Sequence, residues 1–227
     1  KERYLIMNFT TLAFCPLTRM NEVSRYSSVY QERNETLSEH TTEVSMMSYL
    51  IALELRNHYS ESVDIGILLE KCLLHDMDEV ITGDIPRNTK YASRLVHKEM
   101  NNVAIRSVQL IEGMLSLDLK ETWQNAKDGK EGLILKIVDM LCVAKKCITE
   151  IELRGNLTFL KVVSELETHL SNVLVDERLN SEFVKESARK YLKGLITQAK
   201  DEITTIRVKY QNVIDKYHIK ENVIEGE

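Results

Sequence analysis

The sequence contains few of the residues that interrupt helices. Among its 227 residues there are only 8 glycines and 2 prolines, whereas leucine, isoleucine, glutamate, lysine and methionine are plentiful. This composition favours a mostly helical protein. Hydrophobic residues make up 43% and charged residues 29% of the chain, so it is long and apolar enough to bury a core and is not expected to be disordered.

The sequence also lacks a long apolar run and an excess of positive charge. No stretch is long and apolar enough to span a bilayer, so no membrane partner is expected. The net charge of −5 argues against general nucleic-acid binding, which needs a basic surface. It does not exclude a small phosphorylated ligand, because a metal ion and a few cations can hold a phosphate inside an acidic protein.

The four cysteines form no C-x-x-C pair; they are Cys15, Cys72, Cys142 and Cys147. Three of them lie in or beside apolar helical stretches, which is typical of buried free thiols in a reducing compartment. A cytoplasmic protein is therefore predicted. The apolar segment 4–15 follows two basic residues as a signal peptide would, but polar residues interrupt it, and we predict a first helix packed on the core.

Apolar spacing and the positions of helix breakers predict a single all-α domain. Val44, Met47, Ile51 and Leu55 recur at intervals of three and four, the signature of a buried helix face. Thr36 or Ser38 can cap that helix. The expected helices cover residues 5–17, 36–59, 63–80, 92–115 and 133–153, with two more reaching to about 217, the last and most charged from Ser181.

Four polar residues lie within apolar helical segments. His75 and Asp76 follow Cys72-Leu73-Leu74, His40 is in line with the apolar positions of its own helix, and Asp139 lies among aliphatic residues. Burying imidazoles and carboxylates together costs several kcal/mol unless something binds them. Two histidines and two carboxylates are a usual ligand set for Zn, Mn, Fe or Co, so a metal site is one interpretation.

Each of these residues also has an ordinary structural interpretation. His40 could be a hydrogen-bonded core histidine, and His75 with Asp76 a hydrogen-bonded pair at a helix end. Asp139 could form an ion pair with a nearby cation, the candidates being Lys145, Lys146 and Arg154. The residues alone leave both interpretations open.

Three blocks resemble the HD superfamily of metal-dependent phosphohydrolases, and within it the bacterial 5′-deoxynucleotidases. Arg25-Tyr26 leads into Leu37-Ser38-Glu39-His40; residues 74–91 carry the long pattern HD-x-x-E-V-x-T-G-D-x-P; and Lys136-Ile137-Val138-Asp139 follows. The middle block is far more specific than a bare HD pair. The resemblance covers residues 12–156.

The resemblance implies an HD-domain helical bundle with an additional C-terminal helix. It predicts one domain over 1–227, with a catalytic core at about 12–156 and a helical extension at about 157–227. It also implies a divalent ion (Co, Mn, Zn or Mg) and a homodimer. The metal ligands carried over by position are His40, His75, Asp76 and Asp139.

The same resemblance implies roles for residues around the metal. Glu79 stands where the family has its catalytic carboxylate, Arg25 matches a phosphate-contacting arginine, and Asp84 matches a residue that meets the sugar hydroxyl. Lys90 matches a lysine of the same loop. The residues alone favour an exposed helix-end glutamate for Glu79 and a surface arginine for Arg25.

The sequence departs from the family pattern in three places. Tyr26 stands where the family typically has a tryptophan beside the sugar. The glutamate that usually precedes the last Asp helix has Glu121 as its nearest candidate. The charged helix from Ser181 matches no part of the family pattern.

The expected activity is hydrolysis of the 5′-phosphate of deoxynucleoside monophosphates. One alternative is a deoxynucleoside triphosphate hydrolase, in which further cations hold three phosphates, with Arg87, Arg94, His97 and Lys98 as candidates. Another is a silent metal- and nucleotide-binding regulatory domain, and a third is a structural helical dimer module. The last would leave four buried polar residues unexplained.

Overall fold

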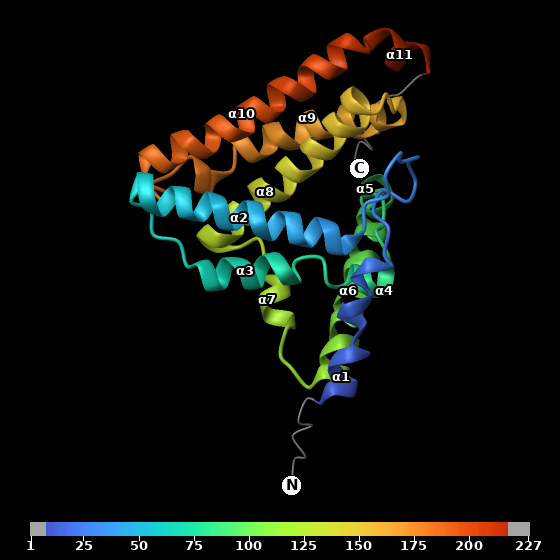
Figure 1. Ribbon diagram of the computed structural model, residues 1–227, viewed down its shortest axis with the longest axis vertical. Coiled ribbons are helices and arrows are strands. Elements are labelled where there is room, and N and C mark those ends of the chain that lie inside the picture. Colours follow the sequence, from blue (N-terminus) through green and yellow to red (C-terminus); the bar gives the residue numbers. More distant parts are fainter. Residues whose placement is uncertain (1–7, 218–227) are drawn as a thin grey trace.

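Four helices pack around a fifth, α8 (Gly129–Ile148), to form a bundle (Figure 1). The computed structural model describes residues 8–217, which are mainly helical and contain no β-strand. The helices around α8 are α2 (Leu37–Tyr59), α3 (Ile65–Leu74), α9 (Leu160–Leu174) and α10 (Glu186–Lys209). The predicted all-α bundle is thus confirmed.

The core of the bundle consists of aliphatic side chains on the facing sides of these helices. α8 is buried nearly all round, with Leu133, Leu135, Ile137 and Val138 fully enclosed. A helix that is apolar on every side belongs in the centre of a domain, because each face needs a partner. This position explains why Asp139, in the middle of α8, points into the protein.

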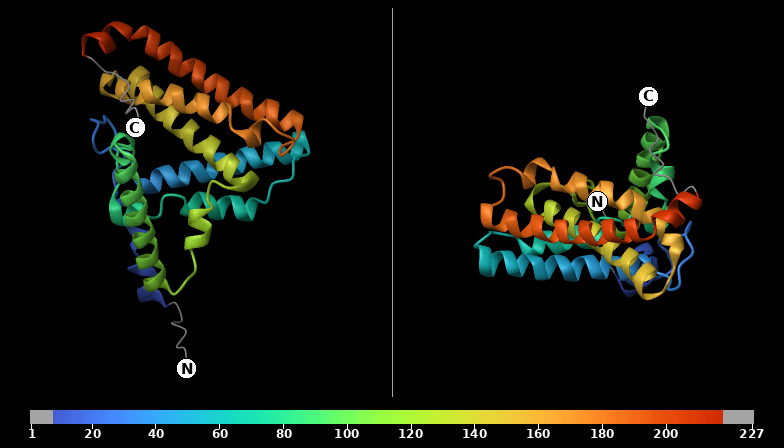
Figure 2. Two further views of the ribbon diagram at one scale, coloured as in Figure 1. Left: turned by 180° about the vertical axis from the view of Figure 1, so that it is seen from behind. Right: turned by 90° about the horizontal axis from the view of Figure 1, so that it is seen from above.

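A second group of elements stands beside the bundle and is here called the α6 arm (Figure 2). It comprises η1 (Pro16–Asn21), α4 (Glu79–Thr82), α5 (Arg87–Lys90) and α6 (Arg94–Leu115), and α7 (Lys120–Gln124) leads from it back to the bundle. A small separate core holds the arm together. Its buried apolar residues are Cys15, Met77, Val108, Ile111 and Leu115.

Local sequence signals set the start of α2. The Thr36 hydroxyl accepts a hydrogen bond from the Glu39 amide, and the Glu39 side chain accepts one from the Thr36 amide. This capping box satisfies two amides that a helix start leaves unpaired. Thr36 is therefore the cap, one of the two residues predicted, and it places His40 one turn into the helix.

The first helix is shorter and less buried than predicted. α1 covers Phe9–Ala13 and has no buried residue, because Pro16 and a 3₁₀ helix end the α-helical path; residues 5–7 lie outside those described. The third predicted helix is also shorter. α3 ends at Leu74, and turns at 75–78 separate it from α4.

The C-terminal part adds α9, α10 and the short α11 (Gln211–Lys216). α10 begins at Glu186, a few residues later than predicted, and packs along both α8 and α9. α8 continues into a π-helical turn, η2 (Thr149–Leu153). The 3₁₀ turn η3 (Leu157–Phe159) precedes α9, and the 3₁₀ turn η4 (Glu177–Leu179) lies between α9 and α10. Within residues 8–217, no helix has the length and apolarity that crossing a bilayer requires.

Candidate active site

Residues from three elements meet where the bundle faces the α6 arm. His40 comes from the first turn of α2, His75 and Asp76 from the turn that ends α3, and Asp139 from the middle of α8. Ligand atoms of His40, His75 and Asp76 all lie within 4.8 Å of one another. His40 Nε2 lies 3.4 Å from Asp139 Oδ1, so Asp139 joins the same cluster.

The two imidazoles are oriented as metal ligands would be. His75 Nδ1 lies 2.7 Å from the Cys72 carbonyl oxygen, to which it must donate, so its Nε2 carries the lone pair. Nε2 of His75 and Nε2 of His40 are both buried and, within the described part of the chain, make no hydrogen bond, although carboxylate oxygens of Asp76 and Asp139 lie 3.0 Å and 3.4 Å from them. Buried polar atoms without a partner are rare, and a cation between them would explain both.

The charge states of the cluster also fit a cation. Burial and the nearby Arg25 lower the pKa of His40, which keeps its imidazole neutral, the form that binds metal. Burial opposes ionisation of Asp139, but Lys127 and His40 hold its pKa well below the usual range. His75 does the same for the pKa of Asp76. The pKa of His75 is raised instead, because the nearby Asp76 outweighs the burial that would lower it. A divalent ion requires neutral imidazoles and ionised carboxylates, so its binding would release the proton that His75 holds.

Glu79 lies one turn beyond His75, at the start of α4, and lines the same cavity. Its Oε2 is buried without a hydrogen bond in residues 8–217. Burial, together with repulsion from Asp76, raises the pKa of Glu79 well above the ordinary value. A raised carboxyl pKa is the property that proton transfer near neutral pH calls for.

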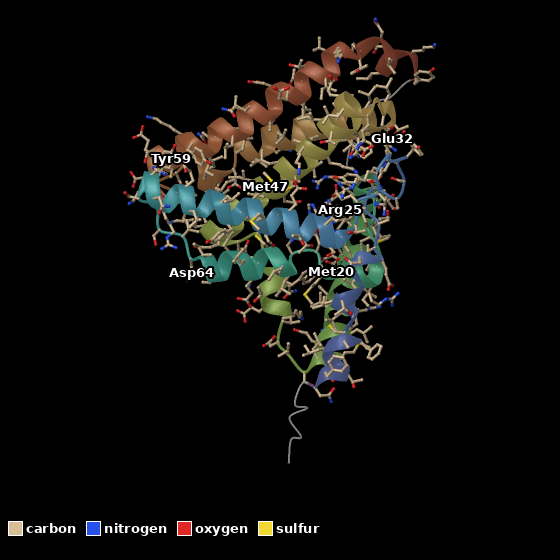
Figure 3. The ribbon with its side chains drawn as sticks, viewed as in Figure 1. Met20, Arg25, Glu32, Met47, Tyr59 and Asp64 are labelled. Carbon is tan, nitrogen blue, oxygen red and sulfur yellow. The ribbon has the colours of Figure 1, made fainter. Side chains whose placement is uncertain are left out.

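Arg25 comes from the loop before α2 and reaches into the cluster (Figure 3). Only 8% of the residue is exposed. Its Nη1 lies 3.3 Å from Asp76 Oδ2 and its Nε 3.4 Å from Glu35 Oε1, so it is held between two carboxylates. A guanidinium fixed in this way offers its remaining donors to the cavity, in a flat fork that suits phosphate.

Tyr26 and Asp84 are joined by a backbone contact. Tyr26 has a φ of +54°, a left-handed conformation that is uncommon for a bulky residue. Its amide donates to Asp84 Oδ2 at 2.5 Å, which stabilises the unusual turn from across the cavity. The Tyr26 ring packs on Phe159 at a centroid distance of 5.3 Å. Strained backbone of this kind is often found at functional sites.

The predicted residues surround one cavity of about 280 Å³, near the lower end of the range for small-ligand sites. Arg25, Tyr26, Asp76, Glu79, Asp84, Lys90 and Asp139 all line it; His40 and His75 lie immediately behind. The structure therefore brings together every residue that the sequence predicted for the site, apart from Glu121, which does not line the cavity.

Sequence comparison places these residues in a known family. The sequence model of the YfbR-like 5′-deoxynucleotidases matches residues 13–193. The chain belongs to this family. A 5′-deoxynucleotidase of Photorhabdus laumondii is 28% identical over 165 residues, 70% of this chain and 83% of that protein. The 5′-deoxynucleotidase YfbR of Escherichia coli is 27% identical over 162 residues, 69% and 81% of the two chains.

Solved structures share the fold. An HD-domain phosphohydrolase from Listeria innocua superposes with a TM-score of 0.61 at 21% identity and covers 86% of this chain and 98% of its own. The PH0347 protein of Pyrococcus horikoshii gives a TM-score of 0.63 at 15% identity, covering 86% and 99%. These likenesses establish the HD-domain helical fold for this YfbR-like chain.

Sequence reasoning missed Lys127, whose Nζ donates to Asp139 Oδ2 at 2.8 Å from the turn before α8. The turn depends on Gly132, because a Cβ there would lie 2.3 Å from the Lys127 carbonyl carbon. Only glycine permits this close approach. No periodic signal in the sequence shows that the lysine of this turn folds back onto the site.

The α9 contribution was missed as well. Lys161, Glu165 and His169 recur every four residues along one face of α9 and line the outer part of the cavity. Burial and Arg87 lower the pKa of His169 to about 4, so this imidazole is neutral at physiological pH. These residues follow the block of motifs that ends at Asn156, and the family match likewise continues beyond it.

Proposed function

We propose that this YfbR-like protein is a metal-dependent hydrolase of the 5′-phosphate of deoxynucleoside monophosphates. The observation that carries the proposal is the meeting of two unpartnered imidazole nitrogens, from His40 and His75, with Asp76 and Asp139 in a cavity that also holds Arg25. Family membership and the curated 5′-deoxynucleotidase relatives support the same activity.

His40, His75, Asp76 and Asp139 would hold the metal ion. Their mixed nitrogen and oxygen donors suit Co, Mn or Zn, and Mg less well, since Mg takes oxygen ligands. The bound ion supplies Lewis-acid chemistry at the phosphate. Lys127 also lines the cavity and would place a further positive charge beside the phosphate.

Arg25 and Glu79 would perform the remaining steps. Arg25 binds the phosphate and orients the phosphorus toward the attacking water. As water oxygen bonds to phosphorus and the bond to O5′ breaks, Glu79 takes a proton from the water and delivers one to O5′. The products are orthophosphate and a deoxynucleoside. Glu79 gives up one proton for each that it takes, so it ends the reaction in its starting state.

The sugar would lie against Asp84, Tyr26 and Lys90. Asp84 uses Oδ2 for the Tyr26 amide, which leaves Oδ1 to accept from a sugar hydroxyl. The Tyr26 side chain, packed on Phe159, forms a wall where the family has tryptophan. Lys90 stands at the end of α5 and lines the same side of the cavity.

Most of the cations proposed to hold extra phosphates lie away from the cavity. Of the four cations proposed to hold extra phosphates, Arg87 lines the cavity, whereas Arg94, His97 and Lys98 do not. His97 instead stacks on Tyr91 at 4.5 Å. A binding-only regulatory domain would have no use for a buried carboxyl with a raised pKa, so Glu79 argues against that alternative.

The test is a panel of ribo- and deoxynucleoside mono- and triphosphates, incubated with Mn²⁺ or Co²⁺ while released phosphate is measured. Orthophosphate from deoxynucleoside monophosphates is the expected result. Tripolyphosphate from triphosphates would support the rival activity. Silence on the whole panel, from protein that retains its metal, would overturn both in favour of the regulatory domain.

We also propose that two copies associate through α6 and work in the cytoplasm. Apolar side chains on α6 and just beyond it are between 42% and 69% exposed and follow one side of the helix: Leu95, Val103, Leu110, Met114 and Leu117. Exposed apolar stripes of this kind mark interaction sites. Sedimentation of wild type and Leu110→Asp tests the dimer, which the variant should dissociate.

The four free, buried cysteines suit a reducing compartment such as the cytoplasm.

A further inference from the structure

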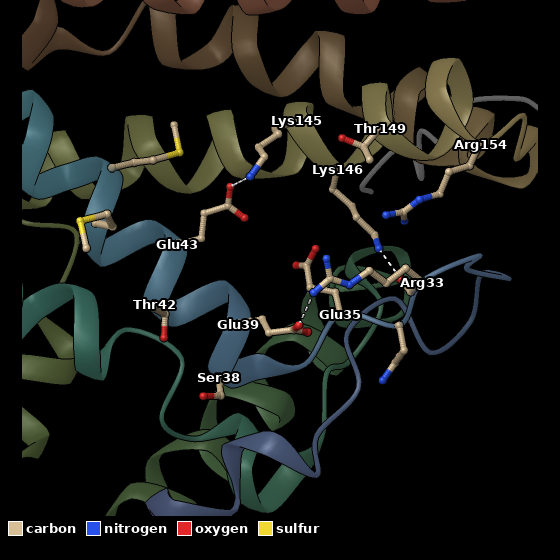
Figure 4. A pocket seen from close by; sticks show the side chains of 13 residues that line it. Arg33, Glu35, Ser38, Glu39, Thr42, Glu43, Lys145, Lys146, Thr149 and Arg154 are labelled. Carbon is tan, nitrogen blue, oxygen red and sulfur yellow. Dashed lines mark hydrogen bonds and ion pairs between the residues drawn. The ribbon is translucent and has the colours of Figure 1, made fainter.

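A second cleft lies on the other side of the loop that carries Arg25. It has a volume of about 670 Å³ and separates α2 from the end of α8 (Figure 4). Its lining shares no residue with the active-site cavity. Residues 33–35 close one end, and the side chains of Met46 and Met47 provide an apolar patch at the other.

The two walls of the cleft carry opposite charges. Glu39 and Glu43 lie on α2, and Lys145 lies opposite on α8 (Figure 4). The ion pairs that cross or close the cleft are solvent-exposed: Lys145 with Glu43, and Arg33 with Glu39 at 2.8 Å. Exposed pairs contribute little, typically about 0–1 kcal/mol, so an anionic ligand could take over these cations at small cost.

The basic residues on the α8 side of the cleft outnumber the carboxylates that pair with them. Lys146 and Arg154 both donate to the same oxygen, Oε1 of Glu150. On the acidic side, Glu35 is held by Arg25, and Glu39 by the Thr36 amide and Arg33. The side chains that line the cleft therefore carry a net positive charge. The hydroxyl groups of Ser38 and Thr42 add neutral hydrogen-bond donors and acceptors.

The loop over residues 24–36 connects this cleft with the metal cluster. A bridge between Ser24 and Thr36 closes the loop, and the Arg25 amide donates to the Glu35 carbonyl at 2.8 Å. Glu35 itself lines the second cleft, while its carboxylate lies 3.4 Å from Arg25 Nε and 3.9 Å from His40 Nδ1. This one residue thus connects the second cleft with the metal cluster.

The far side of the loop rests on the basic wall. Lys146 donates to the Arg33 carbonyl at 2.7 Å, and Glu150 accepts from the Glu32 amide at 3.0 Å. Asn156 donates to the Tyr30 carbonyl at 2.9 Å. A ligand that draws Lys146 or Arg33 to itself must therefore loosen the loop that positions Arg25.

We propose that the cleft between α2 and α8 is a second binding site, for a small molecule with a phosphorylated, hydroxyl-bearing sugar. The phosphate meets Lys145, Lys146 and Arg154, and the sugar hydroxyls donate to Glu43. Occupancy weakens the hold on Arg25 through the 24–36 loop and so raises the KM of the active site. The regulatory part of this inference rests on the proposed function; the binding part does not.

The test uses ribose 5-phosphate and AMP as probes, titrated calorimetrically into the metal-loaded protein. Lys145→Glu places a negative charge in the cleft, and Lys190→Glu, on the exposed face of α10, is the matched control. We expect Lys145→Glu to weaken binding of ribose 5-phosphate by about tenfold or more, while Lys190→Glu leaves it unchanged. Tighter binding of AMP that also depends on Lys145 would identify a nucleotide as the preferred form.

Kinetics without the probe separate this site from the active site. Lys145→Glu should keep the wild-type kcat and KM for dAMP, and ribose 5-phosphate should raise KM in wild type but not in this variant. If Lys145→Glu is poorly folded, Thr149→Glu introduces the same charge from the neighbouring turn. Equal probe binding by wild type and both variants would overturn the site, and binding without a change in KM would overturn the coupling.

Discussion

The bundle and the α6 arm contribute to one site but are held together very differently. The bundle buries a continuous core from α2 to α10, whereas the arm relies on a small cluster centred on Val108 and Ile111. His40 and Asp139 belong to the bundle, and Glu79 and Asp84 to the arm. The proposed metal ligands thus belong largely to the more heavily buried region, and the proposed sugar contact Asp84 to the region with less buried apolar surface.

The largest effect is expected from the bundle side. His40→Ala removes one of the two buried imidazole nitrogens of the cluster and the imidazole that lies 3.4 Å from Asp139 Oδ1. We expect the variant to lose both bound metal and dAMP hydrolysis, as measured by elemental analysis and phosphate release. An active variant with full metal content would exclude His40 from the site.

The next effect belongs to the arm. Glu79→Gln preserves the size of the side chain but removes its proton-transfer capacity, and activity should fall by about 10²- to 10⁴-fold. Metal content should stay at the wild-type level, because Glu79 is outside the ligand cluster. Loss of metal together with activity would reassign Glu79 from proton transfer to ligation.

Core truncations should separate the two regions by stability. Ile137→Ala in the bundle and Ile111→Ala in the arm each remove a fully buried side chain and should cost about 2–5 kcal/mol locally. In hydrogen exchange, Ile111→Ala should speed exchange in α6 while α8 stays protected. Ile137→Ala should speed exchange everywhere. Uniform acceleration in both variants would show that the arm and bundle unfold as one unit.

The smallest effect concerns Glu150, which is fully buried at the end of the bundle. Burial opposes its charge, but hydrogen bonds from Asn156, the Glu32 amide and Lys146 lower its pKa to about 2. A lowered carboxyl pKa gives stability that is present above the unfolded value, about 4.3, and is lost as pH falls toward 2.

Glu150→Gln should therefore lower the free energy of unfolding by about 2 kcal/mol at pH 7. The difference from wild type should shrink as the pH is lowered from 4 to 2, which denaturant titrations at several pH values can measure. Glu167→Gln, a partly exposed glutamate of α9, is a useful comparison. If the difference in free energy of unfolding does not depend on pH, the glutamine side chain destabilises the fold by its shape and not by its lack of charge.

Much of the bundle could be predicted from sequence because its signals are local. Apolar spacing and the two possible caps, Thr36 and Ser38, located α2, and the strongly apolar segment around Ile137 located α8. The four-residue α5 and five-residue α7 escaped prediction, since such short elements show no periodicity.

Site residues were likewise predictable where a local motif marks them and not where only helix packing brings them to the cavity. Residues within a recognisable motif, such as Glu79 and Asp84, were predicted to share one cavity, and they do. Lys127 and the α9 residues were not, because their approach depends on how helices pack and not on nearby sequence. The second cleft was equally invisible, since its walls come from segments about a hundred residues apart in the chain.

The contact between Tyr26 and Asp84 has a consequence for how substrate preference can evolve. Asp84 is the proposed sugar contact and also stabilises the left-handed Tyr26, so replacing it alone would disturb the loop as well as the selectivity. A glycine or asparagine at position 26 tolerates the same backbone conformation without that support. New sugar preferences are therefore most accessible along a mutational path in which position 26 changes before position 84.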